Sequence, residues 1–292
     1  MIALTATRTE AGLFPAASTG DLWFQADHAG FRDSTGAIIE EFYIRLPNDQ
    51  IVFNESESDS GVDFEGRVFA KLEFHDESGD RIGEASRPFE FHAGSLEQAS
   101  SPDRVQLLVI REPFHPRTHD VTVTVEDLNA KKRGLIYLFT KKKKNGALRA
   151  RISAPSDSGA IGVSDLQFAW SVRRAPPGSP FYKNGWSVVP NPGRNFGLYL
   201  DTLHVYSEIR DRSAATDSAW LAVKTVRDAT GRVLGSESDT LSLDDGFGIQ
   251  LVTMPLAGLP AGTYDLSIHL TGLSSGRTAE SIRAFNVLWD EG

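Results

Sequence analysis

The amino-acid sequence predicts an all-β fold, on three observations. Apolar and polar residues alternate with period two in several short runs, as in strands with one buried and one solvated face. Turns that contain aspartate and glycine separate these runs. No segment keeps a helical period over three turns, and 26 glycines and 14 prolines in 292 residues favour short strands over long helices.

The alternating runs occur in both halves of the chain, at 42–46, 68–75, 121–126 and 266–271. In the run 121–126, for example, Val121, Val123 and Val125 alternate with polar residues. We expect each run to form a strand with one face on a core and the other in water. Residues 95–99 are expected to form one short helical turn.

Three segments between the runs have the same turn chemistry, namely 33–36, 76–79 and 228–231. Each begins with an aspartate, which can accept hydrogen bonds from the backbone of its own turn. Each ends with a glycine, which adopts positive φ without a steric cost. These segments therefore predict hairpins.

The second half of the chain repeats part of the first. Segment 70–82 resembles 222–234, at an offset of 152 residues, and 119–128 resembles 264–273, at an offset of 145. Two matches in the same order favour a duplicated domain. Chance similarity between alternating strands is the alternative explanation.

The duplication and the chain length predict two domains in tandem. Segment 155–162 is polar, small and contains Pro155, which is typical of a linker. We expect a disordered leader over 1–18, a first domain over 19–154, the linker over 155–162 and a second domain over 163–292. Each domain has the size and strand spacing of an immunoglobulin-like or fibronectin type III-like β-sandwich. The hydroxyl of Tyr264 is expected to bind the preceding loop, as in a tyrosine corner.

The composition excludes several classes of function. A formal net charge of −9 argues against a nucleic-acid or anionic-membrane binder, because attraction to phosphate needs a basic surface. The absence of cysteine excludes disulfides, thiolate metal sites and cysteine nucleophiles. No apolar run approaches the ~20 residues of a membrane span, so no membrane insertion is expected. Arg8 and Glu10 interrupt the segment where a signal peptide would be apolar.

Three stretches resemble the N-terminal region of the bacterial GWxTD-domain proteins: 21–53, 163–197 and 262–287. The Ser164-Asp165-Leu166 run and the Pro190-Asn191-Pro192 turn are the most specific matches. The Gly-Trp-x-Thr-Asp motif is missing, since Ser187-Val188 follows Gly185-Trp186. The resemblance implies a periplasmic, secreted or other cell-envelope protein, with the cytoplasm as the alternative, and it implies no defined activity.

Candidate metal ligands have a simpler interpretation as surface residues. His115 and His119 have a spacing that serves metals on a helix, but Pro116 opposes that helix. Glu73, His75, Glu90 and His92 would cluster only if their strands pair suitably; alternation on a solvated face explains them equally. The aspartates of the turns and of 244–246 are interpreted as turn caps rather than calcium ligands.

No assembled catalytic motif is found, so we expect a non-catalytic chain that needs no cofactor. Two clusters are candidate binding residues. The first is the basic run Lys141, Lys142, Lys143 and Lys144, which protects a sheet edge or contacts an acidic partner. The second is an aromatic loop with Phe181, Tyr182, Trp186, Phe196 and Tyr199. Its rings either close the end of a sandwich or form a platform for a sugar or a protein.

These observations favour a structural or protein-interaction module of the cell envelope whose protein partner is unidentified. The alternative is a carbohydrate-binding module that holds a polysaccharide with the aromatic loop over 181–199. An enzyme is a third hypothesis, and it requires a concave pocket with perturbed carboxylates or histidines.

Overall fold

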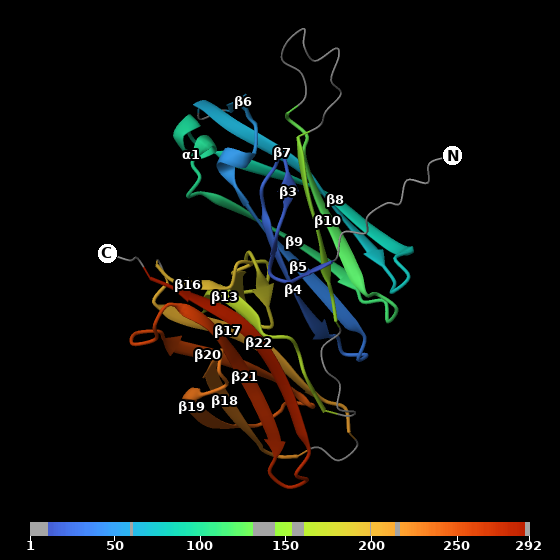
Figure 1. Cartoon of the computed structure of the whole chain (residues 1–292), viewed down its shortest axis with the longest axis vertical. Helices are drawn as coiled ribbons and strands as arrows, with labels where there is room; N and C mark the ends of the chain where they lie inside the picture. Colours follow the sequence, from blue (N-terminus) through green and yellow to red (C-terminus); the bar gives the residue numbers. More distant parts are fainter. Residues whose placement is uncertain are drawn as a thin grey trace. The chain divides into compact units, whose positions relative to one another are not determined.

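A computed structural model describes residues 11–58, 61–130, 144–153, 161–198, 200–213 and 217–289 (Figure 1). The chain is nearly all β, which confirms the predicted all-β sandwich class. The described strands form sheets of seven, six, five and four strands. No helix among the described residues is long and apolar enough to cross a membrane.

The chain divides into two compact units. Unit 1 comprises Met1–Ala26, Leu46–Gln106 and His115–Ser153, and unit 2 comprises Asp27–Arg45, Leu107–Phe114 and Ala154–Gly292. This division differs from the expected one, in which all of 19–154 formed the first domain. The difference arises because the segments 27–45 and 107–114 make their contacts with the C-terminal half of the chain.

Unit 1 consists mainly of the seven-stranded sheet, in the order β1-β11-β10-β7-β6, with β3 on β11 and β8 on β7. Its strands are β1 (Gly12–Leu13), β3 (Thr19–Gly20), β6 (Phe53–Ser58), β7 (Gly61–His75), β8 (Arg81–Ala93), β10 (Asp120–Asp127) and β11 (Asn145–Arg151). One face is buried through alternate residues such as Val68, Leu72 and Val123, as the alternation predicted.

Two short helices also lie in unit 1, η1 (Asn48–Gln50) and α1 (Leu96–Ser100). Ser95 is the N-cap of α1, since its side chain accepts a hydrogen bond from the backbone of Gln98 at 3.2 Å. The short helical turn expected at 95–99 is therefore confirmed.

Unit 2 contains a sandwich of two sheets. One has the order β12-β17-β13-β15-β14 with β20 on β17, and the other has the order β16-β22-β21-β18-β19. The strands are β12 (Ile161–Val163), β13 (Gln167–Arg174), β14 (Tyr182–Lys183), β15 (Trp186–Pro190), β16 (Asn195–Gly197), β17 (Thr202–Asp211), β18 (Trp220–Asp228), β19 (Val233–Leu241), β20 (Phe247–Pro255), β21 (Gly262–Gly272) and β22 (Thr278–Leu288). A continuous hydrophobic core that includes Phe168, Trp220 and Phe285 lies between the sheets.

The four-stranded sheet has the order β2-β4-β5-β9, with strands β2 (Ala16–Ala17), β4 (Gln25–Arg32), β5 (Ile38–Pro47) and β9 (Val105–Pro113). Its residues in unit 2 form a second hydrophobic cluster, in which Phe31 and Tyr43 pack with Val188 and Tyr206. Tyr43 is consequently only 3% exposed. The expectation that every alternating strand turns one face to water is wrong for β5, because Val188 and Tyr206 pack against Tyr43 within unit 2.

The second half of the expected leader is ordered. Gly12–Leu13 forms a parallel pair with Ala150 and Arg151 of β11, and Ala16–Ala17 pairs with β4. The expectation of disorder over 1–18 is therefore wrong for these residues. Leu13 is 73% exposed, so backbone pairing rather than apolar burial holds this segment. Most of the expected linker, 155–160, lies outside the described residues, and 161–162 belong to β12.

The internal repeat is visible in the pairing register. Position 74 corresponds to 226 and position 83 to 235, both 152 residues later, and position 121 corresponds to 266. In the structure Phe74 lies opposite Gly83 and Val121, and Val226 lies opposite Gly235 and Leu266. Both hairpins also contain an irregularity directly after these residues, at His75 and Arg227. Equivalent register over two neighbouring strand pairs supports a duplicated sheet.

The predicted turn chemistry is present in all three turns. Asp228 Oδ1 accepts from the backbone of Thr230 at 3.0 Å and of Arg232 at 3.1 Å, and Asp33 makes the equivalent bonds. The closing glycine has φ of 87° at Gly36 and 85° at Gly79 and Gly231. Tyr264 donates its hydroxyl to the Pro260 carbonyl at 2.7 Å, as expected for a tyrosine corner.

Candidate functional site

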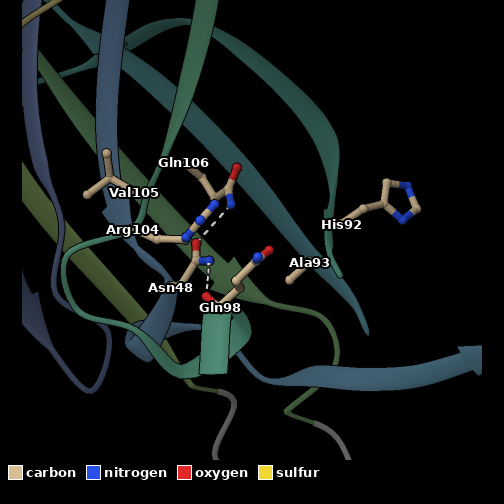
Figure 2. A pocket seen from close by; sticks show the side chains of 7 residues that line it. All are labelled: Asn48, His92, Ala93, Gln98, Arg104, Val105 and Gln106. Atoms are coloured by element: carbon tan, nitrogen blue, oxygen red, sulfur yellow. Dashed lines mark hydrogen bonds between the residues drawn. The ribbon is translucent and has the colours of Figure 1, made fainter. Parts of the chain in front are cut away.

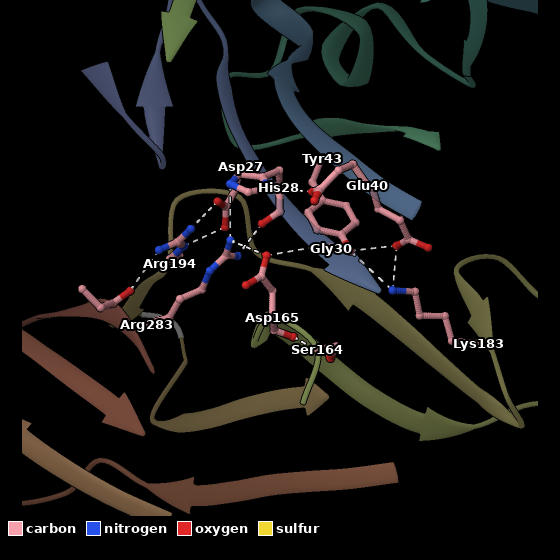
Figure 3. A network of polar contacts seen from close by, with 12 residues as sticks. Asp27, His28, Gly30, Glu40, Tyr43, Ser164, Asp165, Lys183, Arg194 and Arg283 are labelled. Atoms are coloured by element: carbon pink, nitrogen blue, oxygen red, sulfur yellow. Dashed lines mark hydrogen bonds and ion pairs between the residues drawn. The ribbon is translucent and has the colours of Figure 1, made fainter. Parts of the chain in front are cut away.

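A buried network of charged side chains lies in unit 2 (Figure 3). Its members come from β4, β5, the segment before β13, β14, the turn before β16, and β22. They are Asp27, His28, Glu40, Glu41, Tyr43, Asp165, Lys183, Arg194 and Arg283, with Arg111, Asn184, Tyr206 and Glu208 at one side.

Arg194 and Asp27 form a bidentate ion pair. The Nε of Arg194 donates to Asp27 at 2.7 Å, and its Nη2 donates to the other carboxylate oxygen. Both residues are buried, at 4% and 3% exposure. The tight turn that follows Pro190 places the guanidinium here: Arg194 has a φ of 49°, and its backbone donates to the Asn191 carbonyl at 3.0 Å. Because both charges are buried, the pair offsets its desolvation cost only if both hydrogen bonds are formed.

Arg283 of β22 connects three segments. Its Nη2 donates to Asp165 at 3.1 Å and its Nη1 donates to the carbonyl of His28. Asp165 in turn accepts from the backbone N–H of Gly30 at 2.9 Å. A single guanidinium thus joins β22, β4 and the segment that precedes β13 (Figure 3).

His28 and Glu40 form the most desolvated pair of the network. Nδ1 of His28 lies 2.9 Å from Oε2 of Glu40, while Oε1 of Glu40 is buried and makes no hydrogen bond among the described residues. Burial, and then the nearby charge of Asp165, raises the pKa of Glu40 well above its usual value. Burial, and then Arg283, lowers the pKa of His28 well below its usual value. Both shifts favour the neutral forms, in which a protonated Glu40 can donate to Nδ1 of the imidazole.

His28, Glu40 and Asp165 have ligand atoms within 4.8 Å of one another, and such a donor set suits a divalent cation. However, the guanidinium of Arg283 already contacts Asp165 and lies 3.4 Å from Nε2 of His28. A divalent ion would stand beside this positive charge in a medium that screens poorly. The residues fit an internal ion-pair network better than a metal centre.

Lys183 lies at the centre of the other part of the network. Its Nζ lies 2.6 Å from Glu41 and 2.7 Å from Gln167, and 3.3 Å above the centroid of the Phe31 ring. Burial alone would raise the pKa of Glu41, but Lys183 and Arg111 outweigh it and hold that pKa below its usual value. Burial lowers the pKa of Lys183, although Glu41 opposes the change.

Glu208 of β17 ends the network. Its Oε1 accepts from the Tyr206 hydroxyl and from Asn184, both at 2.8 Å. Asn184 has a φ of 44° in the turn between β14 and β15, which aims its amide at Glu208. Burial raises the pKa of Glu208, with Lys183 opposing.

The structure separates the aromatic residues proposed from the sequence. Phe196 is 2% exposed and packs edge-on against Phe168 and Phe285, inside the core of the sandwich. Trp186 packs against the second hydrophobic cluster, with the Arg174 guanidinium 4.0 Å from its ring centroid. Phe181 and Tyr182 are half-buried, and Tyr199 lies outside the described residues. None of the four described rings is exposed.

The basic run is mostly outside the described residues, which include Lys144 but not Lys141, Lys142 or Lys143. Lys144 is half-buried, and its carbonyl accepts from the backbone of Asp127 at 3.0 Å. The proposed role of this run at a sheet edge stays a prediction.

The histidines and acids proposed from the sequence group differently in the structure. His75 and His119 each place Nδ1 3.4 Å from the Asp120 carboxylate, which also binds Arg149 at 2.6 Å. His115 instead accepts from the backbone of Arg117. The candidate cluster of Glu73, His75, Glu90 and His92 does not form, because the β7–β8 register places His92 opposite Glu65 and Glu73 opposite Glu84.

A second candidate site is a polar pocket in unit 1, formed by the end of β8, α1, η1 and the start of β9 (Figure 2). The side chains of Asn48, Gln98, Arg104 and Gln106 converge there, and that of His92 is directed away from them. Ala93 and Val105 complete the lining.

Sequence reasoning missed most of the buried network, and some signals were present. Glu40 and Glu41 are consecutive acids inside an apolar strand, and Asp27-His28 interrupts the apolar run before Phe31. Asp165 and Lys183 lie in the stretches that resemble the GWxTD-domain proteins, but the resemblance attached no role to them. His28 and Glu40 are 12 positions apart, but Asp27 pairs with Arg194 across 167 positions and Asp165 with Arg283 across 118, so no local pattern could pair those charges.

Comparisons with known proteins identify no family. No family model and no curated protein matches the chain. Among solved structures, a Bacteroides uniformis β-glucuronidase is 10% identical, with a TM-score of 0.26 over 91% of this chain and 27% of that one. A putative β-galactosidase from Bacteroides fragilis is also 10% identical, with a TM-score of 0.25 over 84% of this chain and 32% of that one. The chain spans about a third or less of those proteins, and a likeness of this size supports no functional assignment.

Proposed function

We propose that this chain is a non-catalytic structural or protein-interaction module of the cell envelope. The observation that supports this proposal is the enclosure of the acid–base residues of unit 2. His28, Glu40 and Lys183 are 4%, 1% and 8% exposed, and their hydrogen bonds go to one another or to neighbouring side chains. A general acid or base must reach its substrate, and these groups instead hold β4 and β5 against β13, β14 and β22.

The envelope location rests on the resemblance to the GWxTD-domain proteins alone. The alternative of sugar binding by the aromatic loop has less support, since Phe196 lies in the core and the other described rings are half-buried. A sugar platform needs exposed ring faces.

The interaction surface that we propose is the free edge of β19. This strand ends the five-stranded sheet and pairs only with β18 among the described strands, and nearly all of its residues are exposed. An edge strand presents unpaired backbone groups to which an extended segment can add. The equivalent strand of the repeat, β8, contains Pro88, which lacks an N–H, whereas β19 contains neither proline nor lysine.

The charges on β19 indicate the chemistry of the partner segment. The Glu237 and Asp239 side chains are 68% and 55% exposed, and Lys224 contacts both. An extended segment that carries basic residues would complement this edge.

The test uses two equivalent serines of the repeat. Ser238 of β19 and Ser86 of β8 are both exposed and 152 residues apart. The full chain, immobilised, is expected to capture a discrete protein from envelope extracts of the source organism. Ser238→Lys should abolish that capture, because an edge lysine opposes strand addition, and Ser86→Lys should leave it unchanged. Equal capture by both variants would contradict the edge proposal, and turnover of a substrate with a defined pH optimum would contradict the non-catalytic one.

A further inference from the structure

The polar pocket of unit 1 has the dimensions of a small-molecule site. Its volume is about 370 Å³, at the lower end of the range of roughly 300–1,000 Å³ typical of ligand pockets. The lining contains no Phe, Tyr or Trp, and the imidazole of His92 is directed away from the other side chains (Figure 2), so the pocket offers a nucleobase or a sugar ring little stacking surface. Specificity must therefore come from its polar groups.

Hydrogen bonds within the protein fix the amide groups of the pocket. Asn48 is 2% exposed; its Nδ2 donates to the Gln98 carbonyl at 2.7 Å, and its Oδ1 accepts from Nε2 of Gln106 at 2.8 Å. Oε1 of Gln98 accepts from the backbone of Gly94 at 3.3 Å. These contacts leave N–H donors of Gln98 and Gln106 for a ligand, in positions set before it arrives.

Arg104 adds a positive charge to this set of donors (Figure 2). Its backbone carbonyl accepts from Asn48 at 2.8 Å, which anchors the residue beside the amides. Among the residues that the structure describes, no carboxylate pairs with its guanidinium. A chain of net charge −9 thus contains a local concentration of donors around an arginine without a counter-ion.

We propose that this pocket binds a small hydroxylated carboxylate. The guanidinium of Arg104 donates two parallel hydrogen bonds to the carboxylate, because its planar fork matches the two carboxylate oxygens better than a single neutral oxygen. Hydroxyl groups both donate and accept, and so they match the amides of Gln98 and Gln106. The inference concerns unit 1 and is independent of the interaction function proposed for β19.

The first experiment is calorimetric titration of the full chain with three probes. D-Gluconate carries a carboxylate and hydroxyls, sorbitol carries the hydroxyls alone, and acetate carries the carboxylate alone. We expect gluconate to bind with a Kd in the millimolar range or tighter, and the other two to bind at least about tenfold more weakly. Absence of gluconate binding, or equal binding of sorbitol or acetate, would overturn the proposal.

The second experiment uses paired arginine variants. Arg104→Gln should weaken gluconate binding at least about tenfold, because it removes the charge and the fork. Arg117→Gln removes the same charge from an exposed turn of unit 1 and should leave the affinity unchanged. Unchanged binding by Arg104→Gln, or an equal loss in both variants, would refute the assignment. Matching thermal melting curves show that each variant is folded, since the bond from Asn48 uses the backbone at Arg104 rather than its side chain.

Discussion

The ammonium group of Lys183 is buried, and its surroundings offset the free-energy cost of burying this charge. Burying such a charge costs several kcal/mol unless a carboxylate and further acceptors lie beside it. Here Glu41 and Gln167 accept at 2.6 and 2.7 Å, and the Phe31 ring covers the remaining side. The stability of unit 2 therefore depends on keeping each member of this pair with its partner.

Replacing Lys183 with methionine should destabilise the chain by about 3–5 kcal/mol, because Glu41 stays buried with a single cation, Arg111, beside it. The measurement is urea-induced unfolding of the full chain. The matched control is Lys71→Met, which removes a lysine from the partly exposed pair with Glu73 and should cost far less. Similar losses in the two variants would show that burial of Lys183 has no special weight.

Glu40 predicts a specific pH dependence of stability. Burial raises the pKa of Glu40 in the folded state. At pH values between the unfolded-state pKa and the folded-state pKa, the folded chain therefore binds more protons than the unfolded chain. The stability that Glu40 contributes is present below the unfolded-state pKa and is lost as the pH rises through the folded-state pKa. The slope is at most about 1.4 kcal/mol per pH unit.

Glu40→Gln removes this titration while keeping a similar shape. We therefore expect the variant to gain stability relative to the natural chain between pH 5 and pH 8. Unfolding free energies from urea titrations at both pH values measure the difference, and His28, present in both proteins, cancels to first order. A difference that is the same at the two pH values would mean that Glu40 is already ionised in the fold.

At the scale of elements, the two halves of the chain use one hairpin design. β7–β8 and β18–β19 share a turn with an aspartate cap, a glycine at φ 85° and an irregularity at the equivalent position. Neighbouring β10 and β21 pair with them in the same register. The turn sets this register, because its residue count and glycine conformation determine which strand positions face each other.

The glycine requirement of this turn can be tested with two glycines of one hairpin. Neither Gly231 nor Gly235 has an atom within 4 Å of an added Cβ, but only Gly231 has a positive φ. Gly231→Ala should cost about 1–2 kcal/mol of unfolding free energy from backbone strain. Gly235→Ala, in the strand, should be neutral or slightly stabilising. Equal effects would show that the turn relaxes into another conformation.

At the scale of the whole molecule, unit 2 is assembled from segments far apart in the sequence. Residues 27–45 and 107–114 group with 154–292, and Arg194, Arg283 and Lys183 take their partners from β4 and β5. A division of the chain by sequence alone would separate Arg194 from Asp27 and Lys183 from Glu41.

A fragment of residues 155–292 should therefore be less stable than unit 2 in the full chain. It lacks Asp27, Glu41 and the Phe31–Tyr43 part of the second hydrophobic cluster, so Tyr206 and Val188 become exposed. Stronger binding of a hydrophobic dye and a lower thermal midpoint would follow. A fragment that melts like the full chain would show that the network contributes little.

The sequence by itself was sufficient for the features that depend on neighbours along the chain. Period-two alternation predicted β7, β10 and β21, aspartate and glycine predicted the hairpin turns, and Tyr264 predicted its bond to the preceding loop. These features need only local backbone geometry and a choice between core and water, both of which are written in consecutive residues.

Only the tertiary structure decided the candidate sites. Arg194 meets Asp27 across 167 positions and Arg283 meets His28 across 255. The burial of both faces of β5, and the position of Phe196 in the core rather than on the surface, also depend on how sheets pack. The physical reason is that a charge or an aromatic ring has no periodic signature, and its role is set by which distant element covers it.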